Sequence, residues 1–388
     1  MLNRQFLIRV ALLWLSGAGL RLAILAVPPV IPLIRADLQM SATDIGVLSA
    51  LPIVLFVLSA IPGSLLIARL GSRTTLIGGL LFVAVGAVLR GGSWNTITLY
   101  ATTVIMGIGI GAMQPTMPVL AREWLPSRVG FATAIYSNGL LAGELLPVWL
   151  AAPVVLPLVG GSWRAELAIW AAPTLAIALL VIASALRGVR AATDAPRAVW
   201  WPEWKNPLIW RLALLLGTIN AMYFATNAFL PAYLSSLGRD DLIHDALTAS
   251  NLGQLPASLL IVAVASKLER RAWPYIAAGI VMTISVIGLV FAVGPWTIVW
   301  AALLGFAGAA SLILALTLPP LLSAPRDVGR VSAAMFTLSY SIAVVVSLLC
   351  GAVWDFTGIA FSAFAPIALC TLASIVGALI LRANRQLR

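Results

Sequence analysis

Twelve long apolar stretches divide this chain, and they constrain its fold more than any other feature of the sequence. Each is long enough to cross a hydrocarbon core of about 30 Å as a helix, which takes about 20 residues. Because 61% of the residues are hydrophobic and only 10% are charged, a soluble core of this size could not hide the apolar surface. The sequence therefore predicts an all-α integral membrane protein with twelve transmembrane helices, at about 6–34, 44–68, 74–91, 96–121, 129–158, 167–186, 208–235, 243–266, 273–293, 296–322, 328–353 and 357–381.

The distribution of basic residues predicts the orientation of these helices. If both termini are cytoplasmic, the inner segments carry most of the 24 Lys and Arg residues, and the outer loops carry only Arg35, Arg90, Arg164 and Arg239. This is the bias that the positive-inside rule describes. We therefore expect a multi-pass protein of the cell inner membrane with cytoplasmic N- and C-termini. The net charge of +11 follows from the same bias and gives no indication of nucleic-acid binding.

The longest polar segment divides the apolar stretches into two sets of six. It covers residues 187–207 and is expected to be a cytoplasmic linker. The N-terminal half would then be 1–186 and the C-terminal half 208–388. Two six-helix halves around a central cavity are the arrangement in which one half rocks against the other to give alternating access.

The two halves also repeat one another weakly. An offset of 199 residues brings 126–130 onto 325–329, each at the start of an apolar stretch, and Pro32 onto Pro231. Leu51-Pro52 meets Leu255-Pro256 at an offset of 204, because an outer loop is longer. The first offset places Asn220 opposite Arg21. Each half therefore has a polar side chain near the middle of its first expected helix.

Arg21 is a charged residue near the middle of the first apolar stretch. Its guanidinium cannot be neutralised, and at the centre of a spanning helix it costs roughly 2.5–3.5 kcal/mol. Glu144, near the centre of the fifth stretch, is the only acid that the sequence places deep in an expected helix. Two interpretations are open. The pair either orients helices as a fixed ion pair, or Arg21 binds an anionic substrate bidentately while Glu144 carries a coupling proton.

Other polar side chains lie at comparable depths in the expected helices. Asn220, Tyr223 and Asn227 follow i, i+3, i+7 spacing, so they share one face of the seventh helix. For each candidate, hydrogen bonding between helices is an alternative to contact with a substrate. The other candidate substrate-binding residues are Gln114, Tyr136, Asn138, Gln254, Thr317 and Tyr340.

Patterns typical of enzymes do not occur in this sequence. It has no metal-ligand spacing of His, Cys or acidic residues, no nucleophile elbow and no pair of acids at one depth. Cys350 and Cys370 lie inside expected helices, where packing explains them. The glycines at 107, 109 and 111 lie in an apolar stretch and indicate close helix packing rather than a phosphate-binding loop.

The N-terminal part of the chain resembles a known transporter family. The resemblance lies in Gly19-Leu-Arg-Leu-Ala-Ile24 through Val27-Pro-Pro29 to Pro32-Leu-Ile-Arg-Ala-Asp-Leu38, followed by Ser41, Gly46-Val-Leu48 and Leu51-Pro52. These residues are similar to the cyanate and 2-nitroimidazole permeases, the CynX/NimT family of the major facilitator superfamily. The resemblance implies the fold of that superfamily, with two pseudo-symmetric six-helix bundles.

The superfamily's gating loop is partly present. Arg69-Leu70-Gly71-Ser72-Arg73 resembles its inner-loop signature, and the resemblance implies a gating role for Arg69, Gly71 and Arg73. Ala68 stands where the signature usually has an acidic residue. The form of gating that depends on a charge relay in this loop is therefore not implied for this chain.

Together these observations predict a secondary active transporter of a small anion, cyanate-like or a small carboxylate, that is proton-coupled or works by exchange. Transport of compact aromatic molecules of the nitroimidazole type is a second alternative. A non-transporting membrane sensor is a third. We expect no enzymatic activity, no cofactor and no metal. The expected partners are a small anionic substrate, protons and the lipid bilayer, and the protein is expected to be a monomer.

Overall fold

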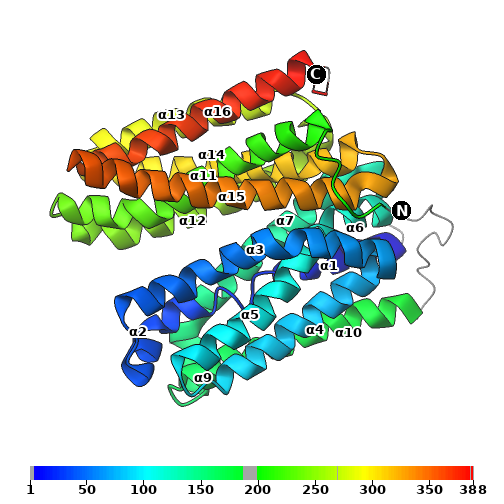
Figure 1. Ribbon diagram of the computed structural model, residues 1–388, viewed down its shortest axis with the longest axis horizontal. Helices are drawn as coiled ribbons and strands as arrows, with labels where there is room; N and C mark the ends of the chain where they lie inside the picture. The colour runs from blue at the N-terminus through cyan, green and yellow to red at the C-terminus, as the bar shows by residue number, and fades with distance from the viewer. Residues whose placement is uncertain (1–3, 187–198, 269, 385, 388) are drawn as a thin grey trace. The chain divides into compact units, whose positions relative to one another are not determined.

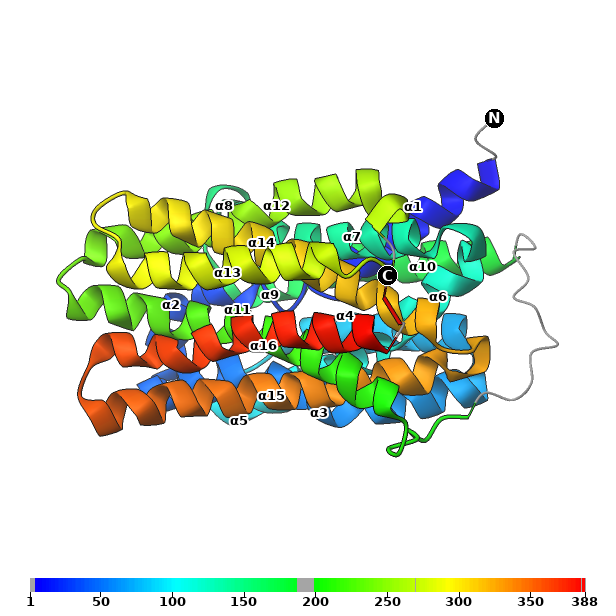
Figure 2. The same ribbon diagram turned by 90° about the horizontal axis from the view of Figure 1, so that it is seen from above.

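The computed structural model describes residues 4–186, 199–268, 270–384 and 386–387. All regular elements of these residues are helical (Figures 1 and 2). Of the expected linker at 187–207, residues 187–198 lie outside the described residues. The first ten α-helices are α1 (Arg4–Gly19), α2 (Val27–Leu38), α3 (Ala42–Leu70), α4 (Ser72–Gly91), α5 (Thr96–Met113), α6 (Thr116–Trp124), α7 (Val129–Leu150), α8 (Leu156–Leu158), α9 (Trp163–Ile169) and α10 (Ala171–Leu186).

The remaining α-helices follow residue 206. They are α11 (Pro207–Ser236), α12 (Ile243–Leu268), α13 (Trp273–Phe291), α14 (Trp296–Leu322), α15 (Val328–Thr357) and α16 (Phe364–Ala383). Short 3-10 turns precede α7, α12, α15 and α16, and a π-helical turn at Ala151–Val155 joins α7 to α8.

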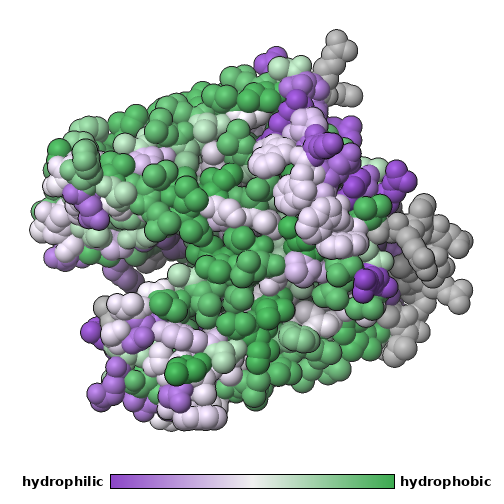
Figure 3. Space-filling model, viewed as in Figure 1, coloured by the Kyte–Doolittle hydropathy of each residue, from purple (hydrophilic) through white to green (hydrophobic). Residues whose placement is uncertain are grey.

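The all-helical membrane fold predicted from the sequence is confirmed. Among the described residues, eleven helices are long and apolar enough to cross a membrane. Many large apolar side chains on these helices are exposed, such as Ile97, Phe291 and Phe356. Figure 3 shows apolar residues along the sides of the helices and hydrophilic residues gathered at their ends. Exposed apolar surface of this extent is explained by contact with lipid.

The first predicted helix, at 6–34, is not continuous, and this accounts for eleven rather than twelve continuous spans. It consists of α1 and α2, which are separated by a non-helical segment at 20–26 (Figure 1). Pro28 and Pro29 have no amide hydrogen to donate to the carbonyl groups of Ile24 and Leu25, and their rings clash with the preceding turn. Both prolines are tolerated in the first turn of α2, where the amide hydrogens would be unused.

The chain forms two compact units. The first comprises Met1–Pro202 and Ser323–Ala333, and the second Glu203–Leu322 and Ala334–Arg388. Within the first unit, α5 packs on α3 and α4, and α10 packs on α4 and α1. Within the second, α14 packs on α12 and α13, and α16 packs on α13 and α11. Corresponding pairs of spans are therefore neighbours in both units.

Close packing of small residues holds these helices together. A Cβ atom on Gly109 would collide with the main chain of Gly79, and one on Gly111 with the side chain of Ser59. The interpretation of this glycine run as close helix packing is confirmed. The two cysteines, Cys350 and Cys370, are buried and free, in agreement with their expected packing role.

Candidate functional site

The break between α1 and α2 contains the candidate substrate ligand Arg21. Main-chain hydrogen bonds in this segment are irregular: the amides of Arg21 and Leu22 both donate to Ala18, and those of Ile24 and Leu25 both donate to Arg21. Non-helical backbone within a spanning segment is tolerated only where protein or a water-filled cavity surrounds it. In transporters, discontinuous helices commonly mark binding sites.

Arg21 and Glu144 form an ion pair. The Nε atom of Arg21 lies 3.2 Å from Oε1 of Glu144 on α7, and their side chains are only 11% and 19% exposed. The guanidinium also lies over the ring of Phe56 on α3, 5.2 Å from the ring centroid. Three helical spans of the first unit therefore meet at one cation, which is enclosed by a carboxylate and an aromatic face.

Glycines explain why α1 and α7 approach closely enough to form this pair. Gly139 and Gly143 lie one turn apart on α7, where Cβ atoms would collide with the main chain of Trp14 and Ala18. Gly17 on α1 makes the reciprocal contact with Tyr136. Small residues with this spacing let helix backbones touch within a membrane. As a result Glu144, next to Gly143, comes within reach of Arg21.

The other candidates in the first unit lie near this contact. Asn138 accepts a hydrogen bond of 2.8 Å from the Trp14 indole, so it joins α7 to α1. Tyr136 is buried in α7, two residues earlier. Gln114 is buried at the junction between α5 and α6. These residues were predicted as candidates because they are polar and lie deep in expected helices. For Asn138, the structure shows a hydrogen-bond partner on another helix.

The candidates of the second unit form two groups. The Tyr223 hydroxyl donates to Asn251 Oδ1 at 3.1 Å and so links α11 to α12. The Gln254 amide, also on α12, donates to the same oxygen at 3.2 Å. Asn220 donates to Ser339 Oγ on α15 at 2.8 Å. The expected shared face of Asn220, Tyr223 and Asn227 therefore contacts two neighbouring helices.

The last three candidates of this unit have local or aromatic contacts. Thr317 and Asn227 hydrogen-bond carbonyl groups of their own helices. Tyr340 is buried, with its ring stacked on Phe336 and tilted against Phe224.

The predicted gating loop joins α3 to α4. Gly71 has φ of +85°, a backbone conformation that favours glycine, and Arg69 lies in the last turn of α3. Arg73 stacks over the Trp124 ring, 5.7 Å from its centroid. Glu123 on α6 accepts a 2.5 Å hydrogen bond from Ser72 and attracts Arg73 electrostatically. An acidic residue therefore contacts this loop although Ala68 occupies the usual position.

Sequence reasoning missed a second set of buried charges. Arg90, expected in an outer loop, is 1% exposed at the end of α4, and Glu166 on α9 is completely buried. Glu144 is therefore not the only acid within the spans. The sixth span begins at Trp163 rather than at 167, so it includes Glu166. Arg90 lies at the end of the third stretch, and a hydropathy pattern does not reveal which helix covers a residue at the end of a span.

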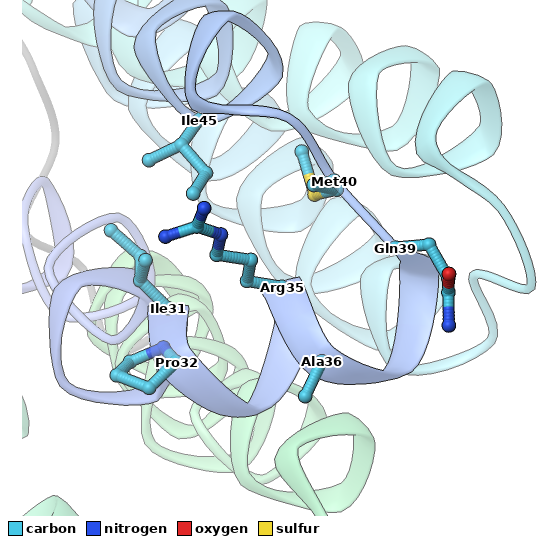
Figure 4. A pocket seen from close by; sticks show the side chains of 7 residues that line it. All are labelled: Ile31, Pro32, Arg35, Ala36, Gln39, Met40 and Ile45. Carbon is cyan, nitrogen blue, oxygen red and sulfur yellow. The ribbon is translucent and has the colours of Figure 1, made fainter.

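An open hollow of about 550 Å³ lies beside the end of α2, apart from the Arg21–Glu144 pair. Figure 4 shows the Arg35 side chain directed from α2 toward Ile45, with Gln39 directed away. Arg35, predicted in an outer loop, lies in the last turn of α2, where a cation complements the helix dipole. The described lining residues of this hollow are otherwise mostly apolar.

The sequence model of the Major Facilitator Superfamily matches residues 13–246, so the chain belongs to this superfamily. The chain is 28% identical over 371 residues to the cyanate transport protein CynX of Escherichia coli (strain K12), which covers 93% of this chain and 94% of that protein. It is 25% identical over 363 residues to the 2-nitroimidazole transporter of the same organism, with coverages of 92% and 90%. The predicted resemblance to these permeases is confirmed.

A solved structure supports the fold. The proton:xylose symporter XylE, bound to 6-bromo-6-deoxy-D-glucose, superposes with a TM-score of 0.77, covering 97% of this chain and 95% of that chain at 13% sequence identity. The protein is thus a multi-pass inner-membrane transporter of the major facilitator fold.

Proposed function

We propose that this transporter moves a small monovalent anion, cyanate-like or a small carboxylate, by alternating access. The observation that carries the proposal is the Arg21 guanidinium, which lies in a helix break and is paired at 3.2 Å with a carboxylate that an anion could replace. Arginine presents a planar fork of donors that matches a carboxylate or a similar anion bidentately. The similarity to a cyanate transport protein over 93% of the chain supports the same substrate class.

Arg21→Lys tests the anion role. The lysine keeps the charge opposite Glu144 but cannot reproduce the planar fork, so we expect a folded protein that binds cyanate at least about tenfold more weakly. Arg35→Lys is the matched control because Arg35 is exposed in the last turn of α2, and its binding should be unchanged. Isothermal titration of purified protein measures both. Normal binding by a folded Arg21→Lys variant would reassign Arg21 to structure.

The pair also suggests how protons couple to transport. In this proposal, ionised Glu144 holds Arg21, and protonation releases the guanidinium for the anion. Anion binding should therefore strengthen as pH falls, because protons and substrate favour the same state. Glu144→Gln imitates the protonated group: it should keep substrate exchange between proteoliposomes and medium but lose acceleration by an inward proton gradient. Full gradient-driven accumulation in this variant would exclude Glu144 as the proton carrier.

Compact aromatic substrates are a second candidate. The Phe56 ring beside Arg21 offers an aromatic face, and the chain is similar to a 2-nitroimidazole transporter. Phe56→Leu separates the two candidates. If aromatic molecules stack there, this variant should bind 2-nitroimidazole about tenfold more weakly and cyanate nearly normally. An equal effect on both ligands would mean that Phe56 acts only through packing.

The orientation is also part of this proposal, since the loop charges support cytoplasmic termini. In a background with both cysteines replaced by Ala, Asp240→Cys should react with a membrane-impermeant maleimide in intact cells. Arg326→Cys should react only after the cells are opened. The reverse pattern would invert the topology.

A further inference from the structure

Arg90 is a large side chain that is almost completely buried. It is 1% exposed at the end of α4. Its Nη1 atom donates a 3.0 Å hydrogen bond to the carbonyl oxygen of Ala23 and lies 3.3 Å from the sulfur of Met106 on α5. A guanidinium does not lose its charge when it is buried, so this location needs an explanation beyond packing.

The carbonyl that Arg90 binds lies inside the break. Ala23 follows Arg21 by two residues, and none of the described main-chain hydrogen bonds of the break ends on the Ala23 oxygen. A buried carbonyl without a donor is unfavourable. Arg90 therefore supplies from α4 the hydrogen bond that the helix would have supplied had it continued through Ala23.

Glu166 offsets the charge of Arg90 without occupying the atom that binds Ala23. It is fully buried on α9, attracts Arg90 electrostatically and accepts a 3.0 Å hydrogen bond from the Trp170 indole. The other elements packed on α9 are α2 and α10. Helix α2 contributes Asp37, which pairs with Arg164 at 2.7 Å. Helix α10 has no ionisable residue.

We propose that Arg90 is a positioning residue for the anion site, acting through the Ala23 carbonyl on the break that presents Arg21. This inference rests on the proposed role of Arg21 as the anion ligand. A segment outside the regular helical hydrogen-bond ladder samples more conformations than a helix, and ordering it when the anion binds weakens affinity. Arg90, which contacts Met106 and is attracted by Glu166, restricts the segment before the anion arrives. Arg21 then needs less reorganisation to exchange its carboxylate partner for substrate.

The test removes both buried charges together, so that neither is left alone. In Arg90→Met/Glu166→Gln, the apolar methionine fills part of the space but donates no hydrogen bond. We expect cyanate to bind about tenfold more weakly and amide hydrogen exchange of residues 20–27 to accelerate about tenfold. Arg90→Lys retains a donor and the charge next to Glu166, so it should restore part of both properties.

Arg164→Met is the matched control. Arg164 also donates to a main-chain carbonyl, that of Ser93, but this carbonyl lies outside the break. The ion pair of Arg164 with Asp37 on α2 is exposed to water, so its loss costs little. Its replacement should leave exchange of residues 20–27 and cyanate affinity unchanged. If the double variant exchanges this segment at the normal rate, or if it loses thermal stability while cyanate affinity stays normal, Arg90 is structural and the inference is wrong.

The exchange measurement also separates this inference from the proposed function. Suppose Arg21→Lys binds cyanate normally. The anion role of Arg21 then fails, and with it the link from Arg90 to substrate. Faster exchange in the double variant would still identify Arg90 as the residue that orders the break. Unchanged exchange would overturn this ordering role of Arg90 as well.

Discussion

The first spans of the two units differ in the continuity of their backbone and in the polar residue that each carries. In the first unit the span is interrupted at 20–26 and carries Arg21, whereas α11 in the second unit runs unbroken from Pro207 to Ser236. At the 199-residue offset of the internal repeat, Pro28 and Pro29 correspond to Asn227 and Ala228. These two residues keep their amide hydrogens. The first span therefore breaks before its adjacent prolines, whereas a single proline such as Pro231 lies inside the continuous helix α11.

The polar residues of the two spans differ as well. Arg21 has a charged partner and an aromatic face, while its counterpart Asn220 donates a single hydrogen bond to Ser339. An arginine in a helix break can change partners, because the surrounding backbone is not fixed by a regular hydrogen-bond ladder. An asparagine in a continuous helix that already bonds its neighbour has less freedom. We therefore expect charge recognition to depend mainly on the first unit.

The largest expected effect comes from moving the break into the second unit. Ala228→Pro removes a main-chain donor from the interior of α11 and should lower the free energy of unfolding by about 3 kcal/mol. Ala228 is exposed, so the effect would come from the backbone and not from a packed neighbour. Pro29→Ala, at the corresponding position of the first unit, should change it by less than about 1 kcal/mol. Denaturant unfolding in mixed micelles compares the two.

Equal losses from these two substitutions would contradict the comparison. They would mean that tertiary contacts, and not the proline pair, decide where the first span breaks. A larger loss from Pro29→Ala would mean that the break is required for the first unit to fold.

An intermediate effect is expected from the contact that brings Glu144 to Arg21. Gly143→Ala places a Cβ against the Ala18 main chain, and overpacking of this kind costs about 2 kcal/mol. The control is Gly377→Ala in α16, where a Cβ would have its nearest neighbours at 3.8 Å. That substitution should stabilise the protein by up to about 1 kcal/mol through helix propensity. Thermal unfolding should therefore shift in opposite directions for the two variants. Unchanged thermal stability in Gly143→Ala would show that α1 and α7 can separate without penalty.

Much of this fold could be predicted from the sequence, because hydropathy alone defines spanning helices. The break in the first span could also have been foreseen from Pro28-Pro29, since a proline pair disrupts the turn before it. Arg21 and Glu144 stood out for the same reason as the spans did: each is a charge within an apolar stretch. That the two side chains pair directly was beyond the sequence, because it depends on how closely Gly139 and Gly143 let α7 approach α1.

Arg90 and Glu166 show where sequence reasoning stops. Both lie at the ends of apolar stretches, where charged residues normally reach water, and their burial follows from the packing of α9 on α4. Glu123 illustrates the same limit, because a carboxylate from α6 contacts the gating loop that lacks its usual acidic residue. Contacts between segments distant in sequence leave no local pattern to detect.

The smallest expected effect concerns Asn220 and distinguishes an interhelical hydrogen bond from a ligand contact. Interhelical hydrogen bonds within membranes average about 0.6 kcal/mol in double-mutant cycles, so the coupling between Asn220→Ala and Ser339→Ala should be of that size. Cyanate affinity should change less than about twofold in Asn220→Ala, because an amide that already donates to Ser339 contributes little to an anion. Thermal unfolding of the two single variants and the double variant gives the coupling, and titration with cyanate gives the affinity. A loss of affinity of about tenfold or more, with little coupling to Ser339, would contradict the comparison, since both first spans would then bind the anion despite their different backbones.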